Sequence, residues 1–242
     1  MPDCRYYQVG GLTIQVESYL PITDTTFHAR FEPFEVDGPG EDNLLIRHHF
    51  TPFDFQNHDL GRRVYRQTPW SIYRKGDRWI YLSVSPTMDD TQAGDVGVLS
   101  VDHTQAEMYH AREDTFRRGD LHSLSMFTTD QIILSHVFAD RQAVIIHSGA
   151  VIMNGQGLLF AGHSEAGKST TMTLLKDAGT GAEILCDDRN IVRKWDNVQD
   201  LPGFGNLTSL HGWRVHGTWS HGDIPDVSPA SAPLRAALFL EQ

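Results

Sequence analysis

The sequence contains few cysteines, few lysines and no long apolar run. Its 242 residues include two cysteines, Cys4 and Cys186, which are too few and too far apart to suggest a disulfide framework or a zinc site. Lysine occurs at four positions: Lys75, Lys168, Lys176 and Lys194. No apolar stretch approaches the roughly 20 residues that span a bilayer, and the first residues lack a secretory signal. We therefore expect a reduced, cytoplasmic setting.

Basic residues are also in the minority. Twenty basic against 31 acidic residues give a formal net charge of −11 and a pI near 5.5. This balance argues against a general nucleic-acid binder and against attachment to anionic lipid by net charge, so no nucleic-acid or membrane partner is expected. The 40% hydrophobic content is ordinary for a globular protein, and the length allows one large domain or two small ones.

The two halves of the sequence differ in their patterns of apolar and polar residues. Residues 1–122 are β-rich: Leu12, Ile14 and Val16 alternate with polar residues, and the segment Arg-Lys-Gly-Asp-Arg between two aromatic runs predicts a hairpin. Near residue 128 a helix is predicted, with a capping box formed by Thr128 and Gln131. The expected organisation is therefore a β-rich N-terminal region over 1–122, followed by a second domain over 123–242.

One short motif stands out in the second half. Gly162-His-Ser-Glu-Ala-Gly167-Lys168-Ser169 matches the phosphate-binding pattern G-x-x-x-x-G-K-[ST] at every fixed position. An apolar strand is predicted before it, fed by an Asn-Gly hairpin turn, and a helix is predicted after it over residues 168–178. In such a loop the backbone N–H groups and Lys168 bind phosphates, and the Ser169 hydroxyl ligates Mg²⁺. The predicted cofactor-binding residues are Gly162, His163, Ser164, Glu165, Ala166, Gly167, Lys168, Ser169 and Thr170.

A short apolar strand that ends in two acids follows the predicted helix. Asp187 comes 19 residues after Lys168, and Asp188 follows it directly. In a parallel α/β sheet the carboxyl ends of strands face the crevice of the phosphate loop, so these acids are expected opposite Lys168. One carboxylate can hold Mg²⁺ and the other can act as a base toward an attacking hydroxyl. The alternative is a turn that caps a surface strand.

From residue 147 to residue 188 the sequence resembles the catalytic domain of HPr kinase/phosphorylase and, more distantly, ATP-dependent phosphoenolpyruvate carboxykinase. The resemblance is carried by His147-Ser-Gly-Ala-Val-Ile, the hairpin, the phosphate loop and Cys-Asp-Asp. It implies an α/β fold with a P-loop kinase domain of the HPr kinase/PEP carboxykinase type, preceded by the β-rich N-terminal region. The N-terminal half and the segment after Asp188 depart from the family pattern, which leaves the substrate open.

The resemblance also implies roles for individual residues. Asp187 would be the base toward a serine hydroxyl, with His147 beside it. Asp188 would hold Mg²⁺ together with Ser169, although the two acids could exchange these roles. Lys168 would neutralise the phosphates of ATP.

The segment after residue 200 is rich in histidine and glycine. Arg214 within it is the candidate cation for charge that develops on the transferred phosphoryl group. His211, His216 and His221 are not spaced like a zinc site, so a loop that contacts phosphate or substrate is favoured.

The expected function is an enzyme, a Mg²⁺-dependent kinase that transfers the γ-phosphoryl group of ATP to a hydroxyl. The expected acceptor is a serine of a protein or peptide. A nucleotide-binding regulator or scaffold without phosphotransfer, and a small-molecule kinase, are the alternatives. The sequence leaves open the acceptor, the base of the nucleotide and the assembly state, a homo-oligomer included. It also leaves open whether the chain is complete at its C-terminal end.

Overall fold

The computed structural model describes residues 2–195 and 212–241. The chain divides into two compact units. Unit 1 comprises Met1–Tyr7 and Leu12–Leu134, and unit 2 comprises Gln8–Gly11 and Ser135–Gln242. The division falls inside a helix, whereas the predicted domain boundary lies between residues 122 and 123. No described helix is long and apolar enough to cross a membrane.

The fold is mostly β, and the expected α/β fold with a P-loop kinase domain is wrong. The described residues form one nine-stranded and one six-stranded sheet, both mixed. Helices account for about 15% of the residues, and two of them have seven residues or more. The prediction assumed that strands alternate with helices, which produces parallel neighbours. Among the described residues from 143 onward, however, α3 (Lys168–Asp177) is the one helix, and most strand pairs are antiparallel.

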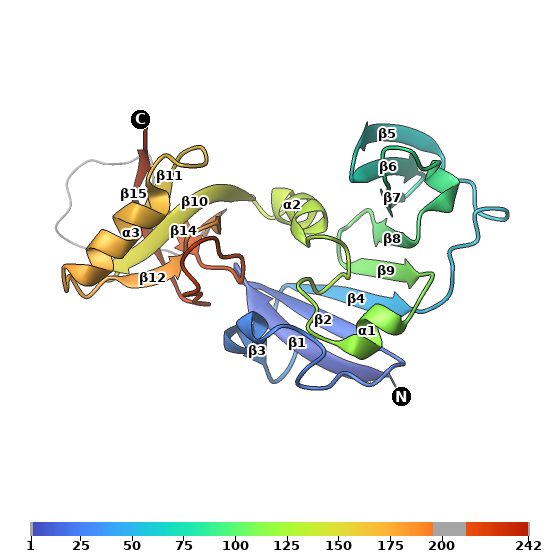
Figure 1. Ribbon diagram of the computed structural model, residues 1–242, viewed down its shortest axis with the longest axis horizontal. Coiled ribbons are helices and arrows are strands. Elements are labelled where there is room, and N and C mark those ends of the chain that lie inside the picture. The colour runs from blue at the N-terminus through green and yellow to red at the C-terminus, as the bar shows by residue number, and fades with distance from the viewer. Residues whose placement is uncertain (1, 196–211, 242) are drawn as a thin grey trace. The chain divides into compact units, whose positions relative to one another are not determined.

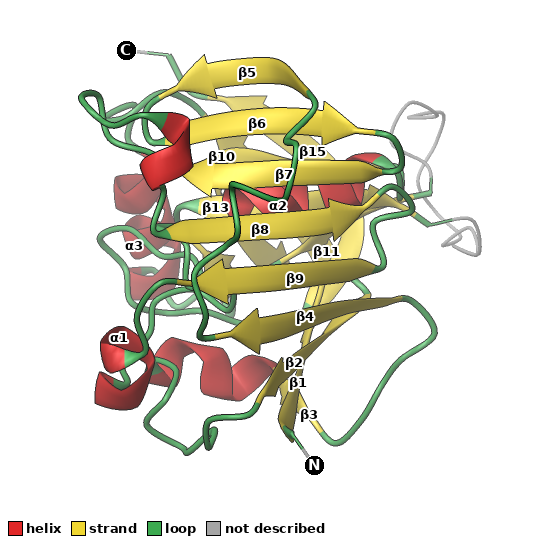
Figure 2. Ribbon diagram, turned by 90° about the vertical axis from the view of Figure 1, so that its right-hand side faces the viewer, coloured by secondary structure: helices red, strands yellow, loops and turns green. Residues whose placement is uncertain are grey.

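Unit 1 is built on the nine-stranded sheet, whose strand order is β3-β1-β2-β4-β9-β8-β7-β6-β5 (Figure 2). Its strands are β1 (Asp3–Val9), β2 (Leu12–Ser18), β3 (Glu35–Val36), β4 (Asn43–His49), β5 (Arg62–Gln67), β6 (Trp70–Lys75), β7 (Arg78–Ser83), β8 (Asp95–Ser100) and β9 (Gln105–His110). The strands from β9 to β5 form an antiparallel meander, and β4 pairs in parallel with β2 and β9. The predicted alternation in β2 and the predicted β6–β7 hairpin are confirmed, since Leu12, Ile14 and Val16 are buried.

The helical segments outside unit 2 are short. They are the 3-10 helices η1 (Ala29–Phe34) and η2 (Asp90–Gln92) and the helix α1 (Asp114–Arg118). Helix α2 (Gln131–Ala139) spans the division between the units and confirms the predicted helix, with Val137 and Phe138 fully buried. The predicted capping box is wrong in detail, because the N–H of Gln131 donates to Thr129 Oγ1 rather than to Thr128.

Unit 2 is built on the six-stranded sheet (Figure 1). Besides α3, its elements are β10 (Ala143–Met153), β11 (Gln156–Ala161), β12 (Glu183–Cys186), β13 (Arg189–Lys194), β14 (Trp213–His216) and β15 (Ser231–Phe239). The pairings run from β11 through β15, β14, β13 and β10 and return to β11. This closure arises because the long strand β10 pairs with β13 along its first half and with β11 along its second half. Strand β12 lies on the other edge of that second half.

Local sequence explains the elements on either side of the phosphate loop. Asn154 and Gly155 have φ values of 52° and 74°, as a two-residue type I′ turn requires, and they connect the antiparallel strands β10 and β11. Helix α3 begins directly after Gly167 and ends shortly before Gly179, whose φ of 63° suits a helix stop. The predicted hairpin, helix and following strand are therefore confirmed.

Helix α3 packs on the sheet through a buried methionine. Met172 is fully buried, and Gly149 of β10 leaves the space for it, because a Cβ at Gly149 would lie 2.2 Å from Met172 Sδ. A hydrophobic cluster surrounds this contact: Val151, Phe160, Met172, Ile184 and Ile224. Burial of one such side chain stabilises a fold by about 1.5–3 kcal/mol. The contact holds the first turn of α3, with Lys168 and Ser169, against the sheet.

Candidate active site

The strands bring the phosphate loop and the two acids to one edge of the sheet. Both β11 and β12 pair antiparallel to β10, on its two sides, so they run in the same direction. Their last residues, Ala161 and Cys186, pair with Ser148 and Ala150 of β10. The loop after β11 and the acids after β12 therefore leave the sheet at the same end.

The loop from residue 162 to residue 167 is tightly curled. Glu165 and Gly167 have positive φ values of 70° and 92°. At Gly162 a Cβ would lie 2.9 Å from the Cβ of Ala166, so the curl requires glycine there. His163, Ser164, Glu165 and Thr170 are exposed. The exposed side chains leave the loop open to solvent on its outer face.

Lys168 occupies the inside of the curl. Its side chain is buried, and Nζ donates to the carbonyl oxygens of Gly162 at 3.0 Å and His163 at 2.8 Å. The ammonium is thus fixed by the backbone that the motif predicts as a phosphate cradle. A bound phosphate would compete with these two carbonyls for the same ammonium.

Asp187 links the start of α3 to a later loop. Its Oδ1 accepts the N–H of Gly222 at 2.6 Å, and its Oδ2 accepts the N–H of Ile224 at 2.9 Å. The Ser169 hydroxyl donates to the same Oδ2 at 3.0 Å. The carboxylate is 3% exposed, so these three donors compensate for its burial. Asp187, rather than Asp188, is therefore the acid beside Ser169.

Asp188 faces a different set of groups. Its Oδ2 accepts the Ser220 hydroxyl at 2.7 Å, and its Oδ1 pairs with the guanidinium of Arg189. His147 Nδ1 lies 3.7 Å from the same Oδ1 and accepts a hydrogen bond from Arg189. Partial burial, and then the positive charges of Arg189 and Lys168, lower the pKa of His147, with Asp188 opposing them. His147 is therefore neutral at pH 7, and it stands beside Asp188 rather than Asp187.

The structure does not bring Arg214 to this cluster. Arg214 lies in β14 opposite Arg193, and its guanidinium donates to the carbonyl and hydroxyl oxygens of Ser231, both at 2.9 Å. Arg193 is four residues along β13 from Arg189, about 13 Å at the rise of a strand. The cation that meets Asp188 is Arg189, which the sequence reasoning missed although it directly follows the two acids.

The loop after β14, for which contact with phosphate or substrate was predicted, contacts the two acids. Its contacts come from Ser220 and from the N–H groups of Gly222 and Ile224. Of the three histidines noted there, His211 lies outside the described residues. His216 is buried in β14, and burial, followed by the charges of two arginines, lowers its pKa to about 4. His216 is therefore neutral and buried, and we interpret it as a core residue of the sheet rather than a catalytic residue.

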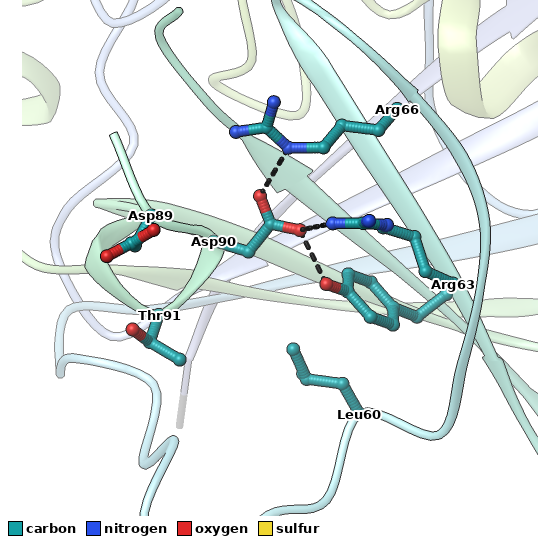
Figure 3. Close-up of a pocket in the computed structure, with 7 residues that line it drawn as sticks. Leu60, Arg63, Arg66, Asp89, Asp90 and Thr91 are labelled. Atoms are coloured by element: carbon teal, nitrogen blue, oxygen red, sulfur yellow. Dashed lines mark hydrogen bonds and ion pairs between the residues drawn. The ribbon is translucent and has the colours of Figure 1, made fainter. Parts of the chain in front are cut away.

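Unit 1 contains a separate open pocket (Figure 3). Its volume of about 420 Å³ would accommodate a small molecule. Asp90 at its wall, however, already pairs with Arg63 and Arg66 and accepts the Ser71 and Tyr73 hydroxyls. Burial raises the pKa of Asp90, but these hydrogen bonds outweigh burial and lower it. We interpret this cluster as a structural ion-pair network, because the pocket's own charges neutralise one another.

One group of metal-ligand types also occurs in unit 1. Ligand atoms of His28, Asp120 and His122 lie within 4.8 Å of one another. Nδ1 of His28 already accepts the N–H of Arg30 at 3.1 Å. A metal would therefore have to use the other ring nitrogen or displace this bond.

Comparison with known proteins identifies no family for the chain. No protein-family model matches the chain, and no curated protein matches it significantly.

Proposed function

We propose that this chain is a Mg²⁺-dependent phosphotransferase that transfers the γ-phosphoryl group of ATP to a hydroxyl, with serine of a protein or peptide as the acceptor. The observation that carries the proposal is the 3.0 Å contact between Ser169 Oγ and the Asp187 carboxylate. It joins the hydroxyl of a phosphate-loop motif to an acid at the end of the next strand. Oxygen ligands of this kind are those that Mg²⁺ prefers.

The contacts favour an exchange of the roles that the family resemblance implies for the two acids. Asp187 is the one that touches Ser169, so these two residues would hold Mg²⁺, which neutralises charge on the phosphates. Asp188 would act as the base, because it already accepts a hydrogen bond from a hydroxyl and lies beside His147. Positioned proton transfer of this kind contributes about 10²–10⁴-fold to a rate.

Two cations are available for the phosphoryl group. Lys168 would exchange the carbonyls of Gly162 and His163 for phosphate oxygens. Arg189 replaces Arg214 as the second candidate cation. Its guanidinium pairs with Asp188, which the acceptor would approach. A guanidinium there can stabilise the charge that spreads over the transferring group.

The decisive test is nucleotide binding and transfer by Lys168→Ala. Wild-type chain should bind Mg·ATP in calorimetry and transfer γ-label to a serine-containing peptide library. Loss of a charge-assisted hydrogen bond worth about 1.5–3 kcal/mol should weaken binding about 10- to 100-fold in Lys168→Ala. Lys176→Ala is the matched control, since Lys176 lies in the same helix but pairs with Asp226 on the surface. If the wild type binds no purine nucleoside triphosphate, the proposal is wrong.

A nucleotide-binding regulator without phosphotransfer is the second candidate. It is favoured by the resting contacts of Asp188, whose two oxygens are already engaged by Arg189 and Ser220. The two functions differ in one measurement. A regulator would bind Mg·ATP and form no ADP, whereas a phosphotransferase would form ADP and label an acceptor.

A further inference from the structure

One hydroxyl of the chain itself already contacts the acid that we propose as the base. Ser220 Oγ donates to Asp188 Oδ2 at 2.7 Å, which is within the reach expected between a nucleophile and its general base. Ser220 is partly accessible and lies in a loop after β14.

The same loop also contacts the proposed metal side of the site. Two residues after Ser220, the N–H of Gly222 donates to Asp187 at 2.6 Å, and Asp187 in turn accepts the Ser169 hydroxyl. The loop therefore lies against both acids at once. Gly222, two residues after Ser220, is thus connected through Asp187 to Ser169 at the start of α3.

We propose that Ser220 is an intramolecular phosphoacceptor, so that the chain phosphorylates itself; this rests on the proposed phosphotransferase function. Ser220 Oγ attacks the γ-phosphorus of ATP and forms the new P–O bond, while its proton passes to Asp188. The bond between the γ-phosphorus and the β,γ-bridging oxygen breaks, and ADP leaves. Proximity favours this reaction, because a hydroxyl held at the site reacts in a unimolecular step.

A second serine in the same segment provides a matched control. Ser228 Oγ donates to Glu183 Oε1, also at 2.7 Å. Glu183 begins β12, whereas Asp187 follows its end, about 13 Å away at the rise of a strand. Ser228 therefore has an equivalent hydrogen bond to a carboxylate without the phosphate loop beside it. A reaction governed by the site should distinguish the two serines.

The test uses the full chain with Mg²⁺ and γ-labelled ATP, and phosphopeptide mapping by mass spectrometry. We expect label on Ser220, at a rate per chain that does not change with protein concentration. Ser220→Ala should lose this label, Ser220→Thr should carry it on the new hydroxyl, and Ser228→Ala should label as the wild type does. Asp188→Asn should slow labelling about 10²–10⁴-fold, with circular dichroism confirming that it remains folded.

Three results would overturn the proposal. ADP formation or peptide phosphorylation with Ser220 unlabelled would refute self-phosphorylation and leave the phosphotransferase function standing. Labelling whose rate per chain rises in proportion to protein concentration would refute the intramolecular step. Absence of both nucleotide binding and ADP formation in the wild type would refute the phosphotransferase function, and self-phosphorylation with it.

Discussion

Asp187 and Asp188 are neighbours in sequence, yet replacing each with asparagine should affect stability very differently. Both oxygens of Asp187 accept a backbone N–H, Oδ1 from Gly222 and Oδ2 from Ile224. An asparagine side chain offers one oxygen and one NH₂ group. In either orientation its NH₂ group therefore faces one of these two N–H donors, which loses its acceptor; Ile224 is buried, whereas Gly222 is exposed.

Asparagine at position 188 meets no such conflict. Its oxygen can face the guanidinium of Arg189, and its NH₂ group can donate to the Ser220 hydroxyl, which accepts as well as donates. The Asp188 side chain is also 24% exposed, so water can replace an imperfect bond. The substitution at Asp188 therefore preserves the local hydrogen bonding.

These contacts set the size of the difference. A buried donor without an acceptor costs about 1–3 kcal/mol, and a hydrogen bond to a charged group is worth about 1.5–3 kcal/mol. Asp187→Asn should therefore lower the free energy of unfolding by about 2–4 kcal/mol, and Asp188→Asn by less than about 1 kcal/mol. With a urea m-value of about 2 kcal/mol/M, the midpoint for Asp187→Asn should fall by about 1 M or more.

Urea denaturation followed by tryptophan fluorescence measures this difference. Asp226→Asn is the control for the loss of one negative charge, since Asp226 is exposed and forms a surface ion pair with Lys176. Equal midpoints for the variants at 187 and 188 would refute the hydrogen-bond assignment. The result also decides which variant can test catalysis: loss of transfer is informative about a base only where the fold is intact.

Two further perturbations test the fold. Gly149→Ala should destabilise the chain by about 1–3 kcal/mol in urea, because its Cβ would lie 2.2 Å from Met172 Sδ. Adding Met172→Ala removes that obstacle, so the double variant should lose less than the sum of both single changes. Burial, followed by the charge of His110, lowers the pKa of His48 from 6.5 to about 3. The fold therefore favours neutral His48, whose contribution is complete above pH 6.5 and is lost toward pH 3. As the pH is lowered from 6.5 to 3, the free energy of unfolding of the wild type should decrease more steeply than that of His48→Gln, by up to about 1.4 kcal/mol per pH unit. Equal slopes for the two proteins would contradict this.

The elements around the phosphate loop could be predicted because their signals are local. The Asn154-Gly155 turn, the curl ending at Gly167 and the helix stop near Gly179 each depend on a few adjacent residues. Strand pairing has no such signal. β10 exchanges partners along its length, and β15 pairs in parallel with β11 some 75 residues earlier. The prediction of an α/β sheet was wrong in its strand pairing, because periodicity within a strand does not specify which strand lies next to it.

The same distinction between local and distant contacts separates the residues found from those missed. A motif and a strand end predicted that Lys168, Ser169, Asp187 and Asp188 lie together, and the Ser169 hydroxyl does contact Asp187. These local signals could not show which acid contacts Ser169, because two of the donors that hold Asp187 come from residues 35 and 37 positions later. Arg214 was proposed from its glycine- and histidine-rich surroundings, but its register in β14 turns it to another part of the sheet.

The loop and the acids came together although the fold prediction behind this expectation was wrong, and the reason is geometric. The acids lie near the loop if two strands run in the same direction and end at the same edge of the sheet. A parallel sheet provides this for neighbouring strands, but an intervening antiparallel strand provides it equally well. In unit 2 that strand is β10, with β11 on one side and β12 on the other. Its Gly149 also admits Met172 of α3, so the strand that replaces parallel pairing supports the helix that carries Lys168 and Ser169.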